Sequence, residues 1–166
     1  MTEASVVPIV AAVAAAGAGV LQAAPDAEAP WLLVNESRSL PPGLYVRTSE
    51  APAPGRIVVI APPPTARAYL TQTRAGPDVR LLKRIAAVGG EVACRNERTL
   101  TWPRGHATAR ARDRTGRRLP AWRDCRRLGP GELLVLGDTA TSFDSRYFGP
   151  VHTDAVVATY REVWRW

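Results

Sequence analysis

The chain lacks the motifs that mark most metal enzymes and nucleic-acid-binding domains. It has only two histidines in 166 residues and no HExxH pair, so the sequence predicts neither a metal site nor another cofactor. No helix-turn-helix, zinc-finger or aromatic RNA-binding signature accompanies its net charge of +7. We therefore expect no nucleic-acid partner. The charge fits an Arg-rich solvated surface or contact with an anionic membrane.

The chain has few cysteines, and its sequence gives little support for a Ser-His-Asp triad. Cys94 and Cys125 have no metal-ligand spacing and form no CxxC motif. An even pair in an exported domain favours one disulfide, and two free thiols are the alternative. Neither His106 nor His152 lies near a GxSxG elbow, which disfavours a triad of the hydrolase type.

Charged side chains are absent from residues 4–25, which are mostly Ala, Val and Gly. At about 1.5 Å per residue, a helix of this length just spans a hydrocarbon core of about 30 Å. A cleaved signal peptide is the alternative, but no Lys or Arg precedes the apolar run and the small-x-small sites near its end are poor. We expect an uncleaved transmembrane anchor whose orientation the positive-inside rule leaves open.

Long amphipathic helical patterns are missing too, since 15 prolines and 13 glycines are scattered along the chain. Short apolar or β-branched runs separated by turn signals take their place. Strands without intervening amphipathic helices predict a mostly β domain over residues 31–166, an antiparallel barrel or sandwich. The expected strands are residues 31–34, 43–46, 56–60, 81–88, 132–137 and 155–160.

A serine-rich turn follows the first of these strands. Ser37 and Ser39 precede Pro41-Pro42-Gly43. The prolines fix φ and stiffen the turn, and a stiff turn can hold a hydroxyl outward at the fixed angle that a nucleophile needs. An ordinary surface turn is the alternative.

Lys83 lies in the expected strand over residues 81–88. Strand alternation places Leu81, Lys83 and Ile85 on one face, and Arg84 on the other. Burial among apolar neighbours disfavours the ammonium form and lowers the pKa of a lysine, so that its amine can accept a proton from serine. The alternative is a lysine whose stem lies along the sheet edge and whose amine reaches water.

The loop over residues 137–151 supplies a third group of polar side chains. Asp144 and Arg146 are placed to form an ion pair that fixes this loop. The hydroxyl of Ser142 is a candidate to hydrogen-bond the lysine amine and orient it. A tight polar loop without a catalytic role is the alternative.

Taken in order, these three blocks resemble the signal peptidase I superfamily and, within it, the conjugal-transfer peptidases of the TraF type. The similarity covers roughly Trp31 to the C-terminus. One departure is the Val88-Gly89-Gly90-Glu91 turn, where members usually have Pro-Gly-Asp. The matching residues are Asn35, Ser39-Leu40-Pro41, Gly43-Leu44-Tyr45, Leu82-Lys83-Arg84, Gly116-Arg117, Leu119-Pro120, Trp122, Cys125-Arg126 and residues 142–151.

The resemblance implies a role for each hydroxyl and for the lysine. Ser39 matches the nucleophile and Lys83 the general base. Ser37 matches the residue whose hydroxyl joins the Ser39 backbone N–H in an oxyanion hole. Ser142 matches the hydroxyl that orients the lysine. The fold implied is a signal-peptidase-like antiparallel β catalytic domain behind one N-terminal transmembrane helix.

The remaining matches concern residues beside the site. Asp144 and Arg146 match a structural pair, and in the TraF type the aspartate is itself implicated in activity. Cys94 and Cys125 resemble the cysteine pair of that type, which implies a disulfide between them.

The function implied is that of a serine endopeptidase that processes exported precursors. The expected location is the inner membrane, with the catalytic domain on the periplasmic side. The expected partners are the membrane and a precursor protein, above all a conjugative pilin subunit for type IV secretion, which is either cleaved or cyclised. A general leader peptidase with the same Ser/Lys pair and a non-enzymatic, membrane-tethered β-domain are the alternatives.

Overall fold

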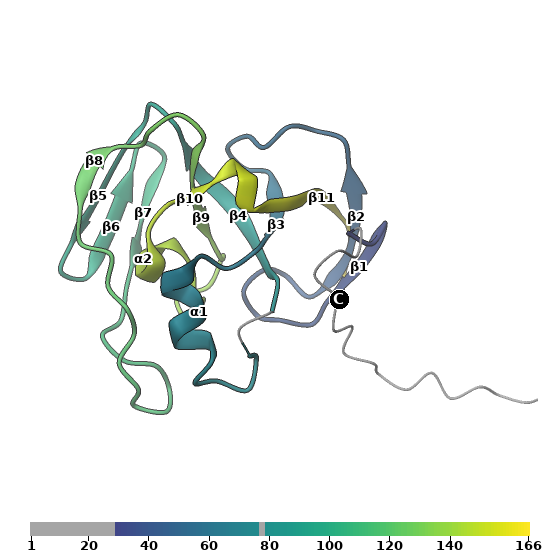
Figure 1. Ribbon diagram of the computed structural model, residues 1–166. Coiled ribbons are helices and arrows are strands. Elements are labelled where there is room, and N and C mark those ends of the chain that lie inside the picture. The colour runs from purple at the N-terminus through teal and green to yellow at the C-terminus, as the bar shows by residue number, and fades with distance from the viewer. Residues whose placement is uncertain (1–28, 77–78) are drawn as a thin grey trace, which may run out of the picture.

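A computed structural model describes residues 29–76 and 79–166 of the chain. Eleven strands within them form two antiparallel sheets (Figure 1). The prediction of a mostly antiparallel β domain is therefore confirmed. The anchor predicted at residues 4–25 lies outside the described residues, and no helix within them is long and apolar enough to cross a membrane.

The larger sheet contains all six of the expected strands, with small differences at their ends. Its seven strands pair in the spatial order β1-β2-β11-β3-β4-β9-β10. The expected last strand is longer than predicted and continues to residue 165. The strand bounds are β1 (Leu32–Asn35), β2 (Gly43–Thr48), β3 (Ile57–Ile60), β4 (Leu81–Val88), β9 (Glu132–Leu136), β10 (Val151–His152) and β11 (Val156–Arg165).

A second, smaller sheet was not predicted. Its four strands pair in the order β7-β6-β5-β8. They are short, and only alternate residues such as Ala93 and Leu100 are buried, so their apolar pattern is weak among the arginines. The expected disulfide joins Cys94 to Cys125, which face each other across two of these strands. The bounds are β5 (Val92–Asn96), β6 (Thr99–Trp102), β7 (Gly105–Thr108) and β8 (Cys125–Arg127).

Two short helices were also not predicted from the sequence. Helix α1 (Pro64–Leu70) begins at the last of three consecutive prolines, a favourable first position because proline has no N–H to leave unpaired. Ala66 and Leu70, one turn apart, are its buried residues. Helix α2 (Ser145–Phe148) lies in what was predicted to be a loop, and its four residues are all buried. A 3₁₀ turn spans Thr153–Ala155.

The two faces of β4 contact different apolar clusters, as the predicted alternation requires. Ile85 packs in the cluster that α1 and α2 cover, whereas Leu82 packs in a cluster with Leu40 on the opposite face. Lys83 is paired across the ladder with Val58, a member of the helix-covered cluster. Directly opposed residues in a sheet point to the same side. Lys83 therefore points toward the helix-covered face.

Candidate active site

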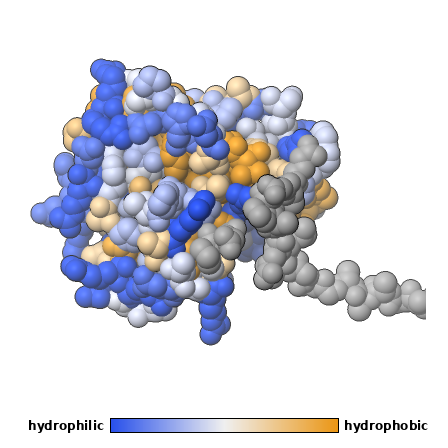
Figure 2. Space-filling view, in the orientation of Figure 1, coloured by the Kyte–Doolittle hydropathy of each residue, from blue (hydrophilic) through white to orange (hydrophobic). Residues whose placement is uncertain are grey.

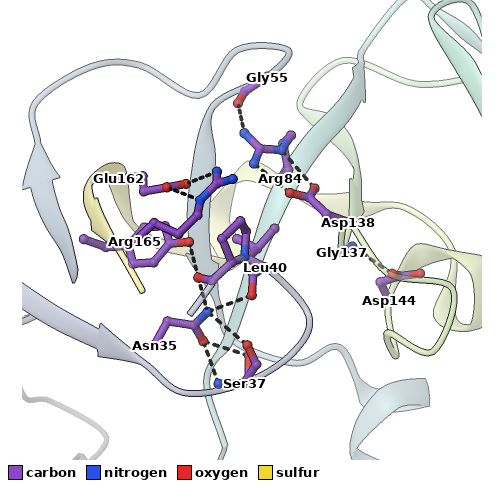
Figure 3. Close-up of polar contacts among 12 residues, drawn as sticks. Asn35, Ser37, Leu40, Gly55, Arg84, Gly137, Asp138, Asp144, Glu162 and Arg165 are labelled. Carbon is purple, nitrogen blue, oxygen red and sulfur yellow. Dashed lines mark hydrogen bonds and ion pairs between the residues drawn. The ribbon is translucent and has the colours of Figure 1, made fainter. Parts of the chain in front are cut away.

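The turn that carries Ser39 is organised by one buried amide, that of Asn35 at the end of β1. Its Nδ2 donates hydrogen bonds to the backbone carbonyls of Ser37, Leu40 and Pro41 at 3.1, 3.1 and 2.9 Å. Its Oδ1 accepts one from the Ser37 backbone N–H at 3.1 Å. Figure 3 shows the Asn35 side chain reaching across the turn to Ser37 and Leu40. The fixed geometry of the turn thus comes from this network as well as from the prolines.

Ser37 is exposed, and its hydroxyl already has a partner. It donates to Asn35 Oδ1 at 2.8 Å. A hydroxyl has a single hydrogen to donate, so an oxyanion contact from Ser37 requires that hydrogen to leave Asn35. In contrast, the Ser39 backbone N–H makes no hydrogen bond within residues 29–76 and 79–166.

Ser39 packs against the loop that follows β9. The Asp138 backbone N–H donates to the Ser39 carbonyl oxygen at 2.7 Å. Gly137 makes this approach possible: a Cβ at that position would lie 2.8 Å from the Ser39 carbonyl oxygen and even closer to Ser142 Oγ. Neither the Gly137 role nor the Asp138 contact was predicted, because both join segments about a hundred residues apart.

Lys83 is the only lysine of the chain, and its side chain is almost entirely buried, with 3% of the residue exposed. Its amine makes no hydrogen bond or ion pair within the described part of the chain. Burial lowers the pKa of Lys83 from its usual 10.5 to about 8. The Asp144 and Asp138 carboxylates oppose that shift of the pKa, and the Arg146 guanidinium adds to it.

Arg84, the next residue along β4, lies on the other face and holds the same loop. Its Nε and Nη2 donate to the two oxygens of the Asp138 carboxylate at 3.0 and 2.9 Å, and its Nη1 donates to the carbonyl of Gly55 at 3.2 Å (Figure 3). Asp138 is thereby bound to β4 through its side chain and to Ser39 through its backbone. The loop after β9 thus contacts Ser39 and lies close enough to Lys83 for Asp138 to affect its pKa.

Asp144 and Arg146 form the ion pair that the sequence predicted. Arg146 Nε and Nη2 donate to the two carboxylate oxygens of Asp144 at 2.8 and 2.5 Å, and both side chains are buried. Asp144 also accepts from the backbone N–H of Gly137 at 2.9 Å, and Arg146 donates to the carbonyl of Thr139 at 2.8 Å. The pair therefore fixes both ends of the loop over residues 137–144.

Ser142 is buried beside this network, but its predicted hydrogen bond to Lys83 is not formed. Its Oγ has no partner within the described residues, and neither does Thr139 Oγ1. A buried hydroxyl without a partner costs about 1–3 kcal/mol. The Ser142 hydroxyl and the Lys83 amine therefore both lack a hydrogen-bond partner among the described residues.

A cavity of about 360 Å³ opens between Ser39, the loop after β9 and the loop that joins β7 to β8. Lys83 does not line it. Three aromatic rings form one wall: Phe143 lies 4.5 Å from Tyr69 and 5.7 Å from Tyr147, measured between ring centroids. The other lining residues are Arg38, Ser39, Arg110, Arg112, Asp113, Arg114, Thr115, Leu119, Thr139, Thr141 and Ser142.

Known proteins resemble this chain over most of its length. The family model for signal peptidase, peptidase S26, matches residues 4–166. A plasmid transfer protein TraF of Escherichia coli is 30% identical over 146 residues, which cover 80% of this chain and 82% of the relative. A second TraF protein of Escherichia coli is 30% identical over 174 residues, covering 95% of this chain and 96% of the relative.

A solved structure is also similar. The match to the crystal structure of a signal peptidase I from Enterococcus faecalis V583 covers 66% of this chain and 96% of that chain, at 20% identity and a TM-score of 0.38. The chain belongs to the signal peptidase family, peptidase S26, is of the TraF type within it, and is a serine peptidase that processes exported precursors.

Proposed function

We propose that Ser39 is the nucleophile and Lys83 the general base of this peptidase. The observation that carries the proposal is the buried Lys83 amine, which makes no hydrogen bond or ion pair in the described part of the chain and has a pKa of about 8. A lysine of ordinary pKa holds its proton too tightly to serve as a base near neutral pH, and an arginine never releases it.

The reaction uses the neutral amine. Lys83 takes the proton of the Ser39 hydroxyl, and Ser39 Oγ attacks the scissile carbonyl carbon. The oxygen that becomes negative accepts a hydrogen bond from the Ser39 backbone N–H, which is uncommitted among the described residues. Ser37 adds a second donor once its hydroxyl turns away from Asn35. Contacts of this kind contribute about 3–4 kcal/mol each to transition-state binding.

The second half of the reaction releases the enzyme. The protonated Lys83 gives its proton to the departing amine, which leaves an acyl group on Ser39. Lys83 then activates an incoming water, and cleavage is complete. When the N-terminal amine of the substrate itself attacks the acyl-enzyme, the product is a cyclic peptide. We assign Ser142 the role of orienting the amine of Lys83 during these transfers; its buried hydroxyl has no other partner among the described residues.

We assign Asp144 a positioning role. Both of its oxygens already accept hydrogen bonds from Arg146 and from the Gly137 backbone, which leaves it poorly placed to exchange protons with substrate. Its negative charge raises the pKa of Lys83 and so moderates the effect of burial. It also fixes the loop that contacts Ser39.

The substrate we propose is a conjugative pilin precursor, cleaved or cyclised at the periplasmic side of the inner membrane. The relatives named plasmid transfer protein support this substrate class. An exposed apolar row supports the membrane location: Val34 and Trp164 both stand opposite Leu44, on β1 and β11. Their neighbours Trp31, Leu32 and Trp166 are also exposed, and tryptophan favours the membrane–water interface.

The test is to co-express the chain with a pilin precursor and to measure the mass of the product. Wild type and Ser49→Ala, an exposed serine outside the site, are expected to process it fully. Ser39→Ala and Lys83→Arg are expected to leave the precursor intact. Full processing by either of the last two variants would end the proposal. Cleavage of unrelated exported precursors after small residues would point instead to a general leader peptidase.

A further inference from the structure

The cavity beside Ser39 carries an excess of positive charge. Four arginines line it, Arg38, Arg110, Arg112 and Arg114, and they are called the arginine rim below. Asp113 is the single carboxylate among its lining residues. Three members of the rim come from the loop between β7 and β8, which lies alongside α1 in Figure 1, in an area that is largely hydrophilic in Figure 2.

The guanidinium groups of the rim are not neutralised from within the described chain. Arg38, Arg110 and Arg114 are exposed, and their side chains make no hydrogen bond or ion pair with the described residues. Arg112 donates only to the carbonyl of Gly116, at 2.7 Å. Like charges that converge on one concavity repel each other, and they raise the local concentration of anions.

Asp113 offsets little of the rim's charge, because its carboxylate is paired with the guanidinium of Arg117, which does not line the cavity, at 3.7 Å. Both carboxylate oxygens also accept hydrogen bonds from neutral groups. One accepts from the Tyr69 hydroxyl at 2.7 Å, and the other from the Thr115 hydroxyl at 2.7 Å and from the Arg117 backbone N–H at 2.9 Å. These bonds tie the loop to α1, so the rim has a defined position over the cavity. The Arg110 backbone N–H, bound to the Tyr147 hydroxyl at 3.1 Å, ties the start of the loop to α2.

We propose that the arginine rim selects precursors with acidic residues within a few positions of the scissile bond. Carboxylates suit it because a guanidinium can bind both oxygens of a carboxylate at once. The inference rests on the proposed reaction at Ser39 and names the substrate feature that brings a precursor there. A flexible peptide fits this site better than a membrane does, since the rim surrounds a concavity, whereas the exposed apolar row lies on β1 and β11.

The first test is cleavage of a mixture of decapeptides with randomised sequence, read by mass spectrometry. The wild type is expected to enrich Asp and Glu near the cut about 3- to 10-fold over Gln and Asn, an effect that falls as salt is raised. Arg110→Gln/Arg114→Gln is expected to abolish the enrichment while it still cleaves. Arg123→Gln/Arg161→Gln removes the same charge from exposed positions outside the cavity and is expected to keep it.

The second test separates this inference from the proposed chemistry. A fluorescein-labelled Glu-rich decapeptide is titrated with Ser39→Ala, which binds without turnover. Anisotropy is expected to show binding several-fold weaker in the Arg110→Gln/Arg114→Gln background and unchanged in the control background. Equal binding in both backgrounds would overturn the inference, whatever the peptidase assay shows. The inference would also be overturned if the Arg110→Gln/Arg114→Gln variant lost affinity for vesicles of anionic phospholipid but not for the peptide.

Discussion

The backbone N–H of Asp138 donates a 2.7 Å hydrogen bond to the carbonyl oxygen of Ser39. The carboxylate of the same aspartate is held at both oxygens by Arg84, the residue after Lys83. One short loop after β9 therefore connects the turn of the proposed nucleophile to the strand of the proposed base. We therefore expect changes in this loop to affect both catalysis and stability.

Gly137→Ala is expected to displace the nucleophile turn. Its Cβ would lie 2.8 Å from the Ser39 carbonyl oxygen and would press on Ser142 Oγ, so the loop must move. We expect kcat/KM to fall at least tenfold, with a loss of about 1–3 kcal/mol in the free energy of unfolding. Gly129→Ala, whose Cβ meets nothing closer than 3.4 Å, is the control. It is expected to keep the kcat/KM and the free energy of unfolding of the wild type. Peptide cleavage and urea denaturation measure the two effects.

Asp144→Asn is expected to cost about 3–5 kcal/mol of stability, because it leaves the Arg146 guanidinium buried without its counter-charge. Adding Arg146→Met should recover part of that loss. A double-mutant cycle from urea denaturation gives the coupling between the two residues. Strictly additive effects would show that the ion pair does not hold this loop.

Lys83→Met is expected to inactivate the enzyme and stabilise the fold at neutral pH. The pKa of Lys83 is about 8 when folded and 10.5 when unfolded, so the folded state binds fewer protons between these values. Below pH 8 the buried ammonium destabilises the wild type by roughly 2–4 kcal/mol, a penalty that disappears as pH rises toward 10.5. The stability gain of the variant should therefore be large at pH 7 and small near pH 10. A gain that is equal at both would contradict this.

Replacing Cys94 and Cys125 by alanine is expected to lower the free energy of unfolding by about 3–4 kcal/mol, since the disulfide closes a loop of 31 residues. The bond joins β5 to β8 in the smaller sheet, whereas Ser39 lies between β1 and β2 of the larger sheet. Activity of the folded variant should remain close to that of the wild type below its melting temperature. Thermal denaturation with parallel peptide cleavage checks both expectations.

The strands of the larger sheet were predictable because their apolar residues are continuous or alternate cleanly. The same alternation predicted that Lys83 and Arg84 face opposite ways, which the ladder with Val58 confirms. The strands over residues 92–127 were missed because each is only three to five residues long and buries few apolar side chains, such as Ala93 and Leu100. Helix α1 was missed because the three consecutive prolines, the last of which is its first residue, indicated the end of a strand.

Local pairs in the site were predictable, and long-range contacts were not. Asp144 and Arg146 are two residues apart, and their ion pair followed from that spacing. The role of Asn35 had a local signal as well, because an asparagine that binds the backbone two residues on is a common turn. The contact of Asp138 with Ser39 spans most of the chain, and no local pattern encodes it.

The titration of Lys83 tests the central claim most directly, and the chain makes it simple because it has one lysine. In protein grown with ¹³C-labelled lysine, the side-chain Cε gives a single resonance, whose shift reports the charge of the amine. The account predicts a midpoint near pH 8, moved lower still in Asp144→Asn provided that variant folds. A midpoint near 10.5 in the folded wild type would show an ordinary solvated ammonium and contradict the proposed base.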